Sequence, residues 1–416
     1  MDFNRRQFLL SSVATFAVAS LSTPLLAADP IVIGVPTAKS GPVGVADQAD
    51  WLNGVTMAVE EINAAGGVNG RPLETRVVDI DLLTPEGTVA AFQSLVEGGV
   101  QALAHSFAII PQPAMDVAAS NGVPYLNGNT SQASLDLIKS NPKYHNIFQI
   151  DVAETYYGAG FVKFLSNQKA AGWKPKNNRI HIVQEQIGYT QVISKATQAA
   201  IAATNGEWVQ GPITDIQFPV QDWTPVIQAI KEADCGVIMI DHWVAAELAS
   251  FAQAYVLDPT QGSLVYLQYG PSQPEFLDLA GEASEGFIWG SVIGVYADEK
   301  GNAFRKAYQE KYPGTMGMVY TGSGYDTIHI LAEVWKTTDP KDFDAVGKAI
   351  KAIKYRGVCG TYTFATDTNS PISYPTMTDD ADSAQAHLIF QVQDGAHKII
   401  SPASLKEADM RPAPWM

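Results

Sequence analysis

The sequence predicts an α/β protein built from two doubly wound parallel-sheet lobes. Short apolar strands alternate with helices from residue 30 onward, and the same alternation starts again near residue 150. This alternation is typical of parallel sheets covered by helices on both faces. No long linker separates the two series, and a chain of 416 residues that is 46% hydrophobic can form more than one core. We therefore expect two similar lobes that lie against each other.

In the first series, apolar runs bounded by turn residues predict strands at 30–38, 71–81, 100–106 and 123–129. The segments between them predict helices at 50–67, 84–99 and 113–122. Trp51, Val55 and Ala58 recur at helical spacing in the first of these helices. Thr84 is the expected N-cap of the second helix, and Gly98 is its expected end.

The second series predicts strands at 179–185, 207–213, 235–241 and 263–270, with helices at 154–168, 189–206, 222–233 and 245–257. A third stretch adds a strand at 286–295 and helices at 302–312, 324–338 and 343–353. The remainder predicts a strand at 360–366 and a terminal hairpin over 386–401. That hairpin is expected to turn at Asp394-Gly395, a pair that favours tight two-residue turns.

Residues 1–27 read as a cleavable signal peptide. Arg5 and Arg6 precede a moderately apolar stretch that ends in small residues, which is the order of parts in a secretory leader. The adjacent arginines followed by "FLL" resemble a twin-arginine export signal, although an ordinary leader could carry the same pair. Serines and a proline interrupt the stretch, and the leader contains no cysteine. We therefore expect a soluble periplasmic protein without a spanning helix or lipid anchor.

Charge and cysteine content exclude several classes of function. The formal net charge of -16 disfavours nucleic acid and anionic lipid surfaces as partners. Two cysteines and seven scattered histidines give no spacing typical of metal ligands, so no metal or other cofactor is expected. Cys235 and Cys359 could pair in an oxidising compartment, or both could be buried free thiols.

Several segments together resemble one family. "GVTMAVEEINAAGGVNGRPLE", "AHSFAIIPQPAMDVAASNGVPYLNGNTSQASL" and "AGEASEGFIWG" are similar to the branched-chain amino acid-type periplasmic binding proteins of ABC transporters. The resemblance extends over about residues 30–365. It implies type I architecture, with two lobes joined by three crossings and a ligand enclosed between them. It divides the chain into lobe 1 (28–150 and 286–357) and lobe 2 (151–285 and 358–416).

The resemblance also implies a ligand contact at "NGNTSQ", where a strand ends. Open parallel sheets bind ligands at the carboxyl ends of their strands. A backbone role is carried over to Asn129 and a hydroxyl role to Ser131, with Thr130 beside them. Ala108 stands where the family usually has a serine, so only its N–H could donate to a ligand carboxylate. The alternative is that Ser131 merely caps the following helix.

For lobe 2 the family pattern assigns ligand contacts to Tyr189, His242 and Tyr269. Tyr269 departs from the pattern because amino acid receptors usually have an acidic residue there for the α-ammonium. Burial of an unpaired ammonium costs several kcal/mol. Either Asp241 or Asp326 therefore supplies the anion, or the ligand lacks an α-amine. Nearby rings, Trp51 and Phe107 among them, would also suit an aromatic or amide-bearing ligand.

An enzyme is not expected, because motifs of hydrolases, metalloproteases and nucleotide-binding enzymes are missing from the sequence. The sequence predicts a substrate-binding protein that delivers a small polar solute to an ABC permease in the inner membrane. The solute could be an amino acid, an aromatic carboxylate, or an amide or urea. A sensory ligand-binding module is the alternative function.

Overall fold

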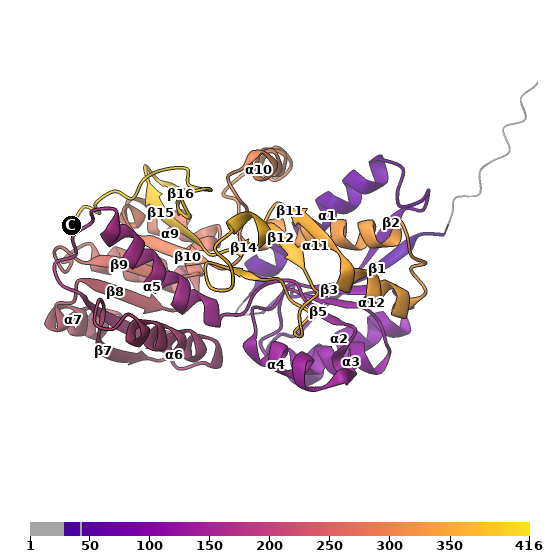
Figure 1. Cartoon of the computed structure of the whole chain (residues 1–416), viewed down its shortest axis with the longest axis horizontal. Helices are drawn as coiled ribbons and strands as arrows, with labels where there is room; N and C mark the ends of the chain where they lie inside the picture. Colours follow the sequence, from indigo (N-terminus) through magenta and orange to yellow (C-terminus); the bar gives the residue numbers. More distant parts are fainter. Residues whose placement is uncertain (1–28, 42–43) are drawn as a thin grey trace, which may run out of the picture.

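The computed structural model describes residues 29–41 and 44–416 and contains two α/β lobes placed side by side (Figure 1). The predicted signal peptide lies outside the described residues. Each lobe is built on one twisted sheet with helices on both faces, as the alternation of strands and helices predicts. The C-terminus lies at the far end of lobe 2 (Figure 1).

Lobe 1 contains an all-parallel sheet of five strands in the order β2-β1-β3-β4-β5. The strands are β1 (Ile31–Thr37), β2 (Leu73–Asp79), β3 (Ala102–His105), β4 (Tyr125–Asn127) and β5 (Ile147–Gln149). The helices from this part of the chain are α1 (Val45–Ala64), α2 (Pro85–Glu97), α3 (Gln112–Ser120) and α4 (Gln132–Ser140). Thr84 caps α2 by accepting a hydrogen bond from the Gly87 amide at 3.2 Å, and Gly98 follows the last helical residue, as predicted. Strand β5 was not predicted.

Lobe 2 contains a seven-stranded sheet in the order β16-β15-β10-β9-β8-β6-β7. Its strands are β6 (Arg179–Glu185), β7 (Val209–Ile216), β8 (Val237–Asp241), β9 (Leu264–Gln268), β10 (Ile288–Ser291), β15 (Leu388–Gln393) and β16 (Ala396–Ser401). Its helices are α5 (Thr155–Ala170), α6 (Gly188–Ala203), α7 (Thr224–Ala233), α8 (Ala245–Tyr255) and α9 (Glu275–Ala280). The terminal hairpin β15–β16 is antiparallel, and Asp394 and Gly395 at its turn both have positive φ.

The chain passes between the lobes three times. It leaves lobe 1 after β5, returns after β10, and crosses again before β15. The returning segment supplies α10 (Glu299–Lys311), α11 (Tyr320–Trp335) and α12 (Phe343–Ala352). Helix α11 packs along α1, where the Thr321 carbonyl oxygen leaves no room for a Cβ on Gly54. The prediction placed residues 286–357 in lobe 1, but β10 pairs with β9 and β15 in the second sheet, so the return follows Ser291.

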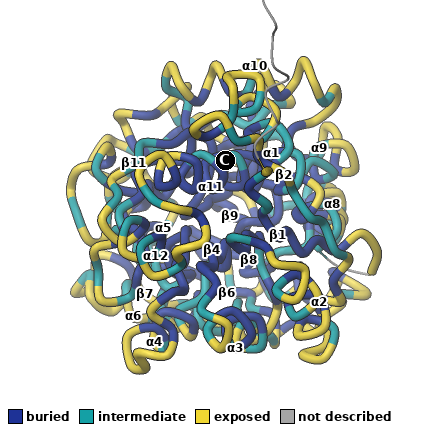
Figure 2. Tube along the Cα trace, turned by 90° about the vertical axis from the view of Figure 1, so that its right-hand side faces the viewer, coloured by how far each residue is buried: buried dark blue, intermediate teal, exposed yellow. Residues whose placement is uncertain are grey.

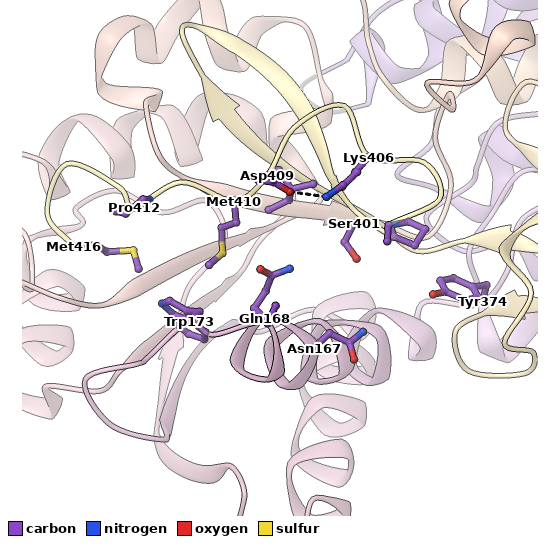
Figure 3. Close-up of a pocket in the computed structure, with 14 residues that line it drawn as sticks. Asn167, Gln168, Trp173, Tyr374, Ser401, Lys406, Asp409, Met410, Pro412 and Met416 are labelled. Atoms are coloured by element: carbon purple, nitrogen blue, oxygen red, sulfur yellow. Dashed lines mark hydrogen bonds and ion pairs between the residues drawn. The ribbon is translucent and has the colours of Figure 1, made fainter.

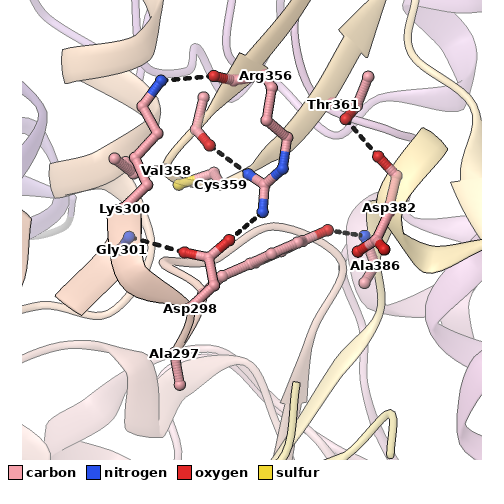
Figure 4. Close-up of polar contacts among 12 residues, drawn as sticks. Ala297, Asp298, Lys300, Gly301, Arg356, Val358, Cys359, Thr361, Asp382 and Ala386 are labelled. Atoms are coloured by element: carbon pink, nitrogen blue, oxygen red, sulfur yellow. Dashed lines mark hydrogen bonds and ion pairs between the residues drawn. The ribbon is translucent and has the colours of Figure 1, made fainter. Parts of the chain in front are cut away.

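Short strands and polar contacts fasten the crossings to one another. Strands β11 (Lys354–Gly357) and β12 (Gly360–Thr363) form one pair, and β13 (Ser373–Tyr374) and β14 (Gln385–Ala386) form another. The Tyr296 hydroxyl accepts a hydrogen bond from the Ala386 amide at 2.7 Å and donates one to the Ala384 carbonyl at 3.2 Å. Arg356 forms an ion pair with Asp298 in the same region (Figure 4). These contacts tie the second crossing to the third.

The buried apolar residues form three clusters. One covers a face of the lobe 1 sheet, a second covers a face of the lobe 2 sheet, and the third extends through both lobes. Exposed residues form the periphery and the buried ones lie inside (Figure 2). Cys235 and Cys359 are both buried free thiols, so the disulfide that the sequence left open is not formed. The cluster shared by both lobes means that they meet over an apolar contact as well as a polar one.

Candidate functional site

The candidate site lies where the carboxyl ends of the parallel strands of both sheets face each other. In lobe 1, β3 ends at His105 and β4 ends at Asn127. In lobe 2, β8 ends at Asp241 and β9 ends at Gln268. All four side chains are buried. Ligands of open parallel sheets bind at such strand ends, so these residues define where a solute would be enclosed.

The structure brings Ala108 and Asn129 together, but it joins them to each other. The Asn129 side-chain oxygen accepts from the Ala108 amide at 3.0 Å, and its amide group donates to the Ala108 carbonyl at 2.8 Å. The backbone amide of Asn129 donates to the Asn127 side-chain oxygen at 3.0 Å. A Cβ on Gly128 would lie 2.5 Å from the Ser106 carbonyl, so glycine permits this close approach. The two backbone donors predicted for a ligand carboxylate therefore already have acceptors.

Ser131 occupies the N-cap position of α4. Its hydroxyl oxygen accepts a hydrogen bond from the Ser134 amide at 3.1 Å, and its own amide donates to the Gln149 side chain at 3.3 Å. This is the capping arrangement that the sequence offered as the alternative to ligand contact. Thr130 is half-buried, and its carbonyl accepts from the Glu154 amide at 2.8 Å, which joins this loop to the start of α5.

A cluster of aromatic rings lies beside this loop and includes a residue that the sequence analysis missed. The ring of Tyr320, at the start of α11, stacks on Phe107 at a centroid distance of 5.6 Å. It also meets the edges of Trp51 at 6.2 Å and Tyr269 at 6.4 Å. The predicted rings Trp51, Phe107 and Tyr269 are thus gathered around one unpredicted tyrosine. Its only sequence signal is an aromatic residue at a helix start, next to the glycines of "YTGSG".

A hydrogen-bonded contact joins the two lobes at Asp47, on the first turn of α1. The Asp47 carboxylate accepts from the Tyr269 hydroxyl at 2.9 Å and from the Gln273 side chain at 2.6 Å. Burial raises the pKa of Asp47 to about 7, although these two hydrogen bonds oppose the shift. Tyr269 therefore does not present an anion to a ligand as the usual acidic residue would. Its hydroxyl donates a hydrogen bond to a carboxylate of the other lobe.

Tyr189, which the sequence analysis assigned to ligand contact, lies on the first turn of α6 in lobe 2. Its hydroxyl accepts a hydrogen bond from the Gln268 side chain at 3.1 Å, and burial raises its pKa. Tyr157, on α5, lies beside Tyr189 and Gln268, and its hydroxyl is 3.4 Å from that of Ser291 at the end of β10. Three elements of lobe 2 thus contribute to one polar and aromatic patch.

His242 is fully buried, and its ring nitrogens contact two glutamates. Its Nδ1 lies 3.0 Å from Glu185, and its Nε2 lies 3.1 Å from Glu247, the latter without good hydrogen-bond geometry. Burial lowers the pKa of His242, but the two carboxylates raise it more, and the net shift is upward. This arrangement holds the turn after β8 against α8 and leaves neither ring nitrogen for a ligand.

Asp326, on α11, likewise forms its hydrogen bonds with other residues of the protein. Its carboxylate accepts hydrogen bonds from the amides of Val358 and Cys359 at 2.8 and 2.9 Å, and from the Tyr362 hydroxyl at 3.0 Å. Burial raises its pKa to about 6, with these hydrogen bonds acting in the opposite direction. Asp326 therefore anchors the β11–β12 turn. Asp241 differs, because both of its oxygens lack a hydrogen-bond partner among the described residues.

Within residues 29–41 and 44–416, no three His, Cys, Asp or Glu side chains are grouped as metal ligands would be. Nor does this part of the chain contain a helix of the length and apolarity needed to cross a membrane. A hollow of about 550 Å³ lies near the C-terminus in lobe 2 (Figure 3), and none of the four strand-end side chains lines it. Trp173, Met410 and the Lys406–Asp409 ion pair contribute to its lining.

Comparison with known proteins gives consistent matches over nearly the whole chain. A family model described as periplasmic binding protein matches residues 30–386. The chain is 25% identical over 356 residues to the leucine-, isoleucine-, valine-, threonine- and alanine-binding protein of Pseudomonas aeruginosa, covering 84% of this chain and 90% of that protein. It is 23% identical to the Leu/Ile/Val-binding protein homolog 1 of Brucella abortus, with 83% and 88% of the two chains covered.

Solved structures agree. A Silicibacter pomeroyi protein assigned to branched-chain amino acid ABC transport is 33% identical, with a TM-score of 0.85, covering 93% of this chain and all of that chain. The isoleucine complex of a branched-chain amino acid transporter substrate-binding protein from Streptococcus pneumoniae is 18% identical, with a TM-score of 0.73, covering 90% of this chain and all of that one. The second likeness concerns the fold.

Proposed function

The chain belongs to the periplasmic binding protein family, and from this premise we propose that it captures a small polar solute between its lobes and delivers it to an ABC permease in the inner membrane. The curated relatives are named as amino acid-binding proteins, and the two solved structures are described as proteins of branched-chain amino acid transport, which supports this function over a sensory module. Branched-chain amino acids are the first solutes to test, because the relatives are named for them.

The observation that carries this proposal is the polar contact between the lobes beside the strand ends. Asp47 of lobe 1 meets Tyr269 and Gln273 of lobe 2 there, and three crossings connect the two halves. Such a pair of lobes can open to admit a solute and close around it, because a solute that bridges both lobes favours the closed form. The permease would then bind the closed shape in preference to the open one.

Calorimetry and small-angle scattering on the same ligand-free preparation test this function. The protein is unfolded to release any bound solute, refolded, and screened by thermal shift against amino acids, amines, carboxylates and amides. We expect at least one class to raise the melting temperature and to make the scattering curve more compact. If no class changes either quantity, the chain is not a solute receptor.

We also infer that residues 1–27 direct export by the twin-arginine route. Arg5-Arg6 followed by "FLL" supports this inference. Changing both arginines to lysine retains the positive charge of an ordinary leader but removes the paired guanidinium groups. We expect the variant to stay in the cytoplasm of a bacterial host, as measured by fractionation and immunoblotting. Unchanged appearance in the periplasm would indicate an ordinary secretory leader.

A further inference from the structure

Asp241 is a buried carboxylate with no partner at the strand ends where the lobes meet. It is the last residue of β8, in the middle of the lobe 2 sheet, and its side chain is fully buried. Neither carboxylate oxygen accepts a hydrogen bond from any described residue. A buried carboxylate in this state is costly, since native proteins pair or hydrogen-bond nearly all such groups.

Among the residues that the structure describes, none supplies Asp241 with a hydrogen bond or an ion pair from a positive charge. The charge acting on it most strongly is that of Glu185, another carboxylate. His242, the next residue in the chain, contacts Glu185 and Glu247 on its two sides. The buried His105 of the opposite lobe has a pKa lowered to about 3 by burial, so it is neutral. The hydrogen bonds and ion pairs of Asn129, Tyr189 and Tyr269 likewise involve no lysine or arginine.

Aromatic rings surround the same place. Tyr189 and Tyr266 are both close enough to Asp241 for its negative charge to raise the pKa of their hydroxyls, and Tyr157 lies near both tyrosines. Tyr266 stacks on Phe161 at a centroid distance of 4.1 Å, which fixes its ring. Ring faces carry negative charge density and attract ammonium groups, most strongly where water is excluded. A carboxylate among tyrosines is therefore suited to an organic cation.

The opposite end of the site is poorly suited to an anion. The Ala108 amide donates to Asn129, and the Asn129 amide donates to Asn127. A ligand carboxylate would have to displace these hydrogen bonds, and the acidic side chains of Asp241, which has no partner, and of Glu185, which is paired with His242, would repel its negative charge. The two ends of the site thus favour the same sign of charge.

We propose that the solute carries a protonated amine or another compact organic cation, and that this cationic group binds Asp241 beside Tyr189. The site then prefers a monocation to a zwitterion or an anion with the same carbon skeleton. This rests on the proposed function as a solute receptor. It differs from that function in predicting which charge the solute carries. It also means that Asp241 replaces the acidic residue that the family pattern places at position 269.

Matched compounds of equal shape test the preference. One set comprises leucine, 3-methylbutylamine, 4-methylpentanoate and 4-methylpentanamide. A second comprises phenylalanine, phenethylamine, 3-phenylpropanoate and 3-phenylpropanamide, and choline and spermidine extend the range of cations. Calorimetry on the ligand-free mature protein should give cations at least about 10-fold tighter binding than their matched carboxylates and amino acids. Mass spectrometry of the solute that co-purifies with native protein should identify a cation.

Each other outcome counts against a defined claim. Tighter binding of leucine, phenylalanine or either carboxylate overturns the charge preference but leaves the receptor function standing. Tighter binding of the neutral amides does the same. Failure of every compound, together with the absence of a co-purifying solute, overturns the charge preference and the receptor function together.

The variant Asp241→Asn tests the anchoring residue. Loss of the carboxyl group should weaken binding of the cation about 100-fold or more, while the melting temperature of the ligand-free protein is unchanged or higher because a buried acidic group without a hydrogen-bond partner is removed. Asp215→Asn is the matched control, since Asp215 is an exposed carboxylate on β7 of the same sheet. We expect it to change affinity less than about twofold. Unchanged affinity in Asp241→Asn would overturn the proposal. If that variant does not fold, Asp241→Glu should still prefer cations.

Discussion

Ser131 has a structural role that can be separated from any contact with solute. Its hydroxyl caps α4 through the Ser134 amide, while its half-buried position leaves it close to the strand ends. At the residue scale, a cap and a ligand donor make different predictions. The cap acts on the folded protein whether solute is present or not, whereas a ligand donor acts on affinity alone.

We expect Ser131→Ala to lower the free energy of unfolding by about 1 kcal/mol, because the first turn of α4 loses a side-chain acceptor. Urea unfolding of the ligand-free protein measures this. Ser131→Thr, which keeps a hydroxyl acceptor, is the matched control and should retain most of the stability. Full stability in the alanine variant, combined with weaker solute binding, would instead favour the ligand-contact role.

At the scale of elements, the crossings are stabilised by a few buried polar groups. The Tyr296 hydroxyl forms hydrogen bonds with the third crossing. The Gln385 side chain forms hydrogen bonds with the first crossing, since it accepts from the Val152 amide at 3.1 Å and donates to the Ile150 carbonyl at 2.8 Å. One short segment, 384–386, therefore contacts both other crossings. When one lobe moves against the other, the hydrogen bonds of Tyr296 and Gln385 must therefore be distorted or kept as one group.

Tyr296→Phe should lower the free energy of unfolding by about 1–3 kcal/mol, because the buried Ala386 amide loses its acceptor and the Ala384 carbonyl keeps only the Thr361 amide as a donor. Thermal and urea unfolding measure the loss. Tyr355→Phe is the control, since Tyr355 lies on the neighbouring β11 and its hydroxyl makes no hydrogen bond with a described residue. Equal effects of the two substitutions would show that the Tyr296 hydroxyl contributes nothing special to the crossings.

At the scale of the whole molecule, contact between the lobes should depend on pH. Burial raises the pKa of Asp47 to about 7 and that of Asp50 to about 8, from an ordinary value of 3.8. The closed, folded form therefore binds more protons than the open or unfolded form between about pH 4 and 7. The stability that protonation of Asp47 contributes is fully present below about pH 4 and is lost as pH rises toward 7.

We expect Asp47→Asn to weaken this dependence, because an amide can still accept from Tyr269 but does not ionise. Melting temperatures at pH 5, 6, 7 and 8 measure it, and the variant should gain relative to the natural protein as pH rises. Glu74→Gln, on the exposed side of β2, is the charge-matched control. A constant difference between Asp47→Asn and the natural protein across this range would contradict the assignment.

The architecture was predictable because local patterns specify it. Apolar runs and caps located most helices and strands, and Asp394-Gly395 located the terminal turn, since such signals act within a few residues. Strand β5 was missed because three residues give no measurable periodicity. Strand β10 was assigned to lobe 1, although it pairs with the preceding strand β9, because its other partner β15 lies far along the chain. The site was harder to predict from the sequence, because the hydrogen-bonded residues Asp47 and Tyr269 lie 222 positions apart in the chain.

The placement of β15 has a consequence for how the chain folds as it is synthesised. Strand β10 pairs with β15, and Phe390 and Ile399 of the terminal hairpin complete the apolar interior of lobe 2. Helix α1 of lobe 1 likewise packs against α11, which is synthesised much later in the chain. Neither half can therefore finish its interior before most of the polypeptide has left the ribosome. Nascent chains truncated before residue 388 should expose the edge of β10 and aggregate.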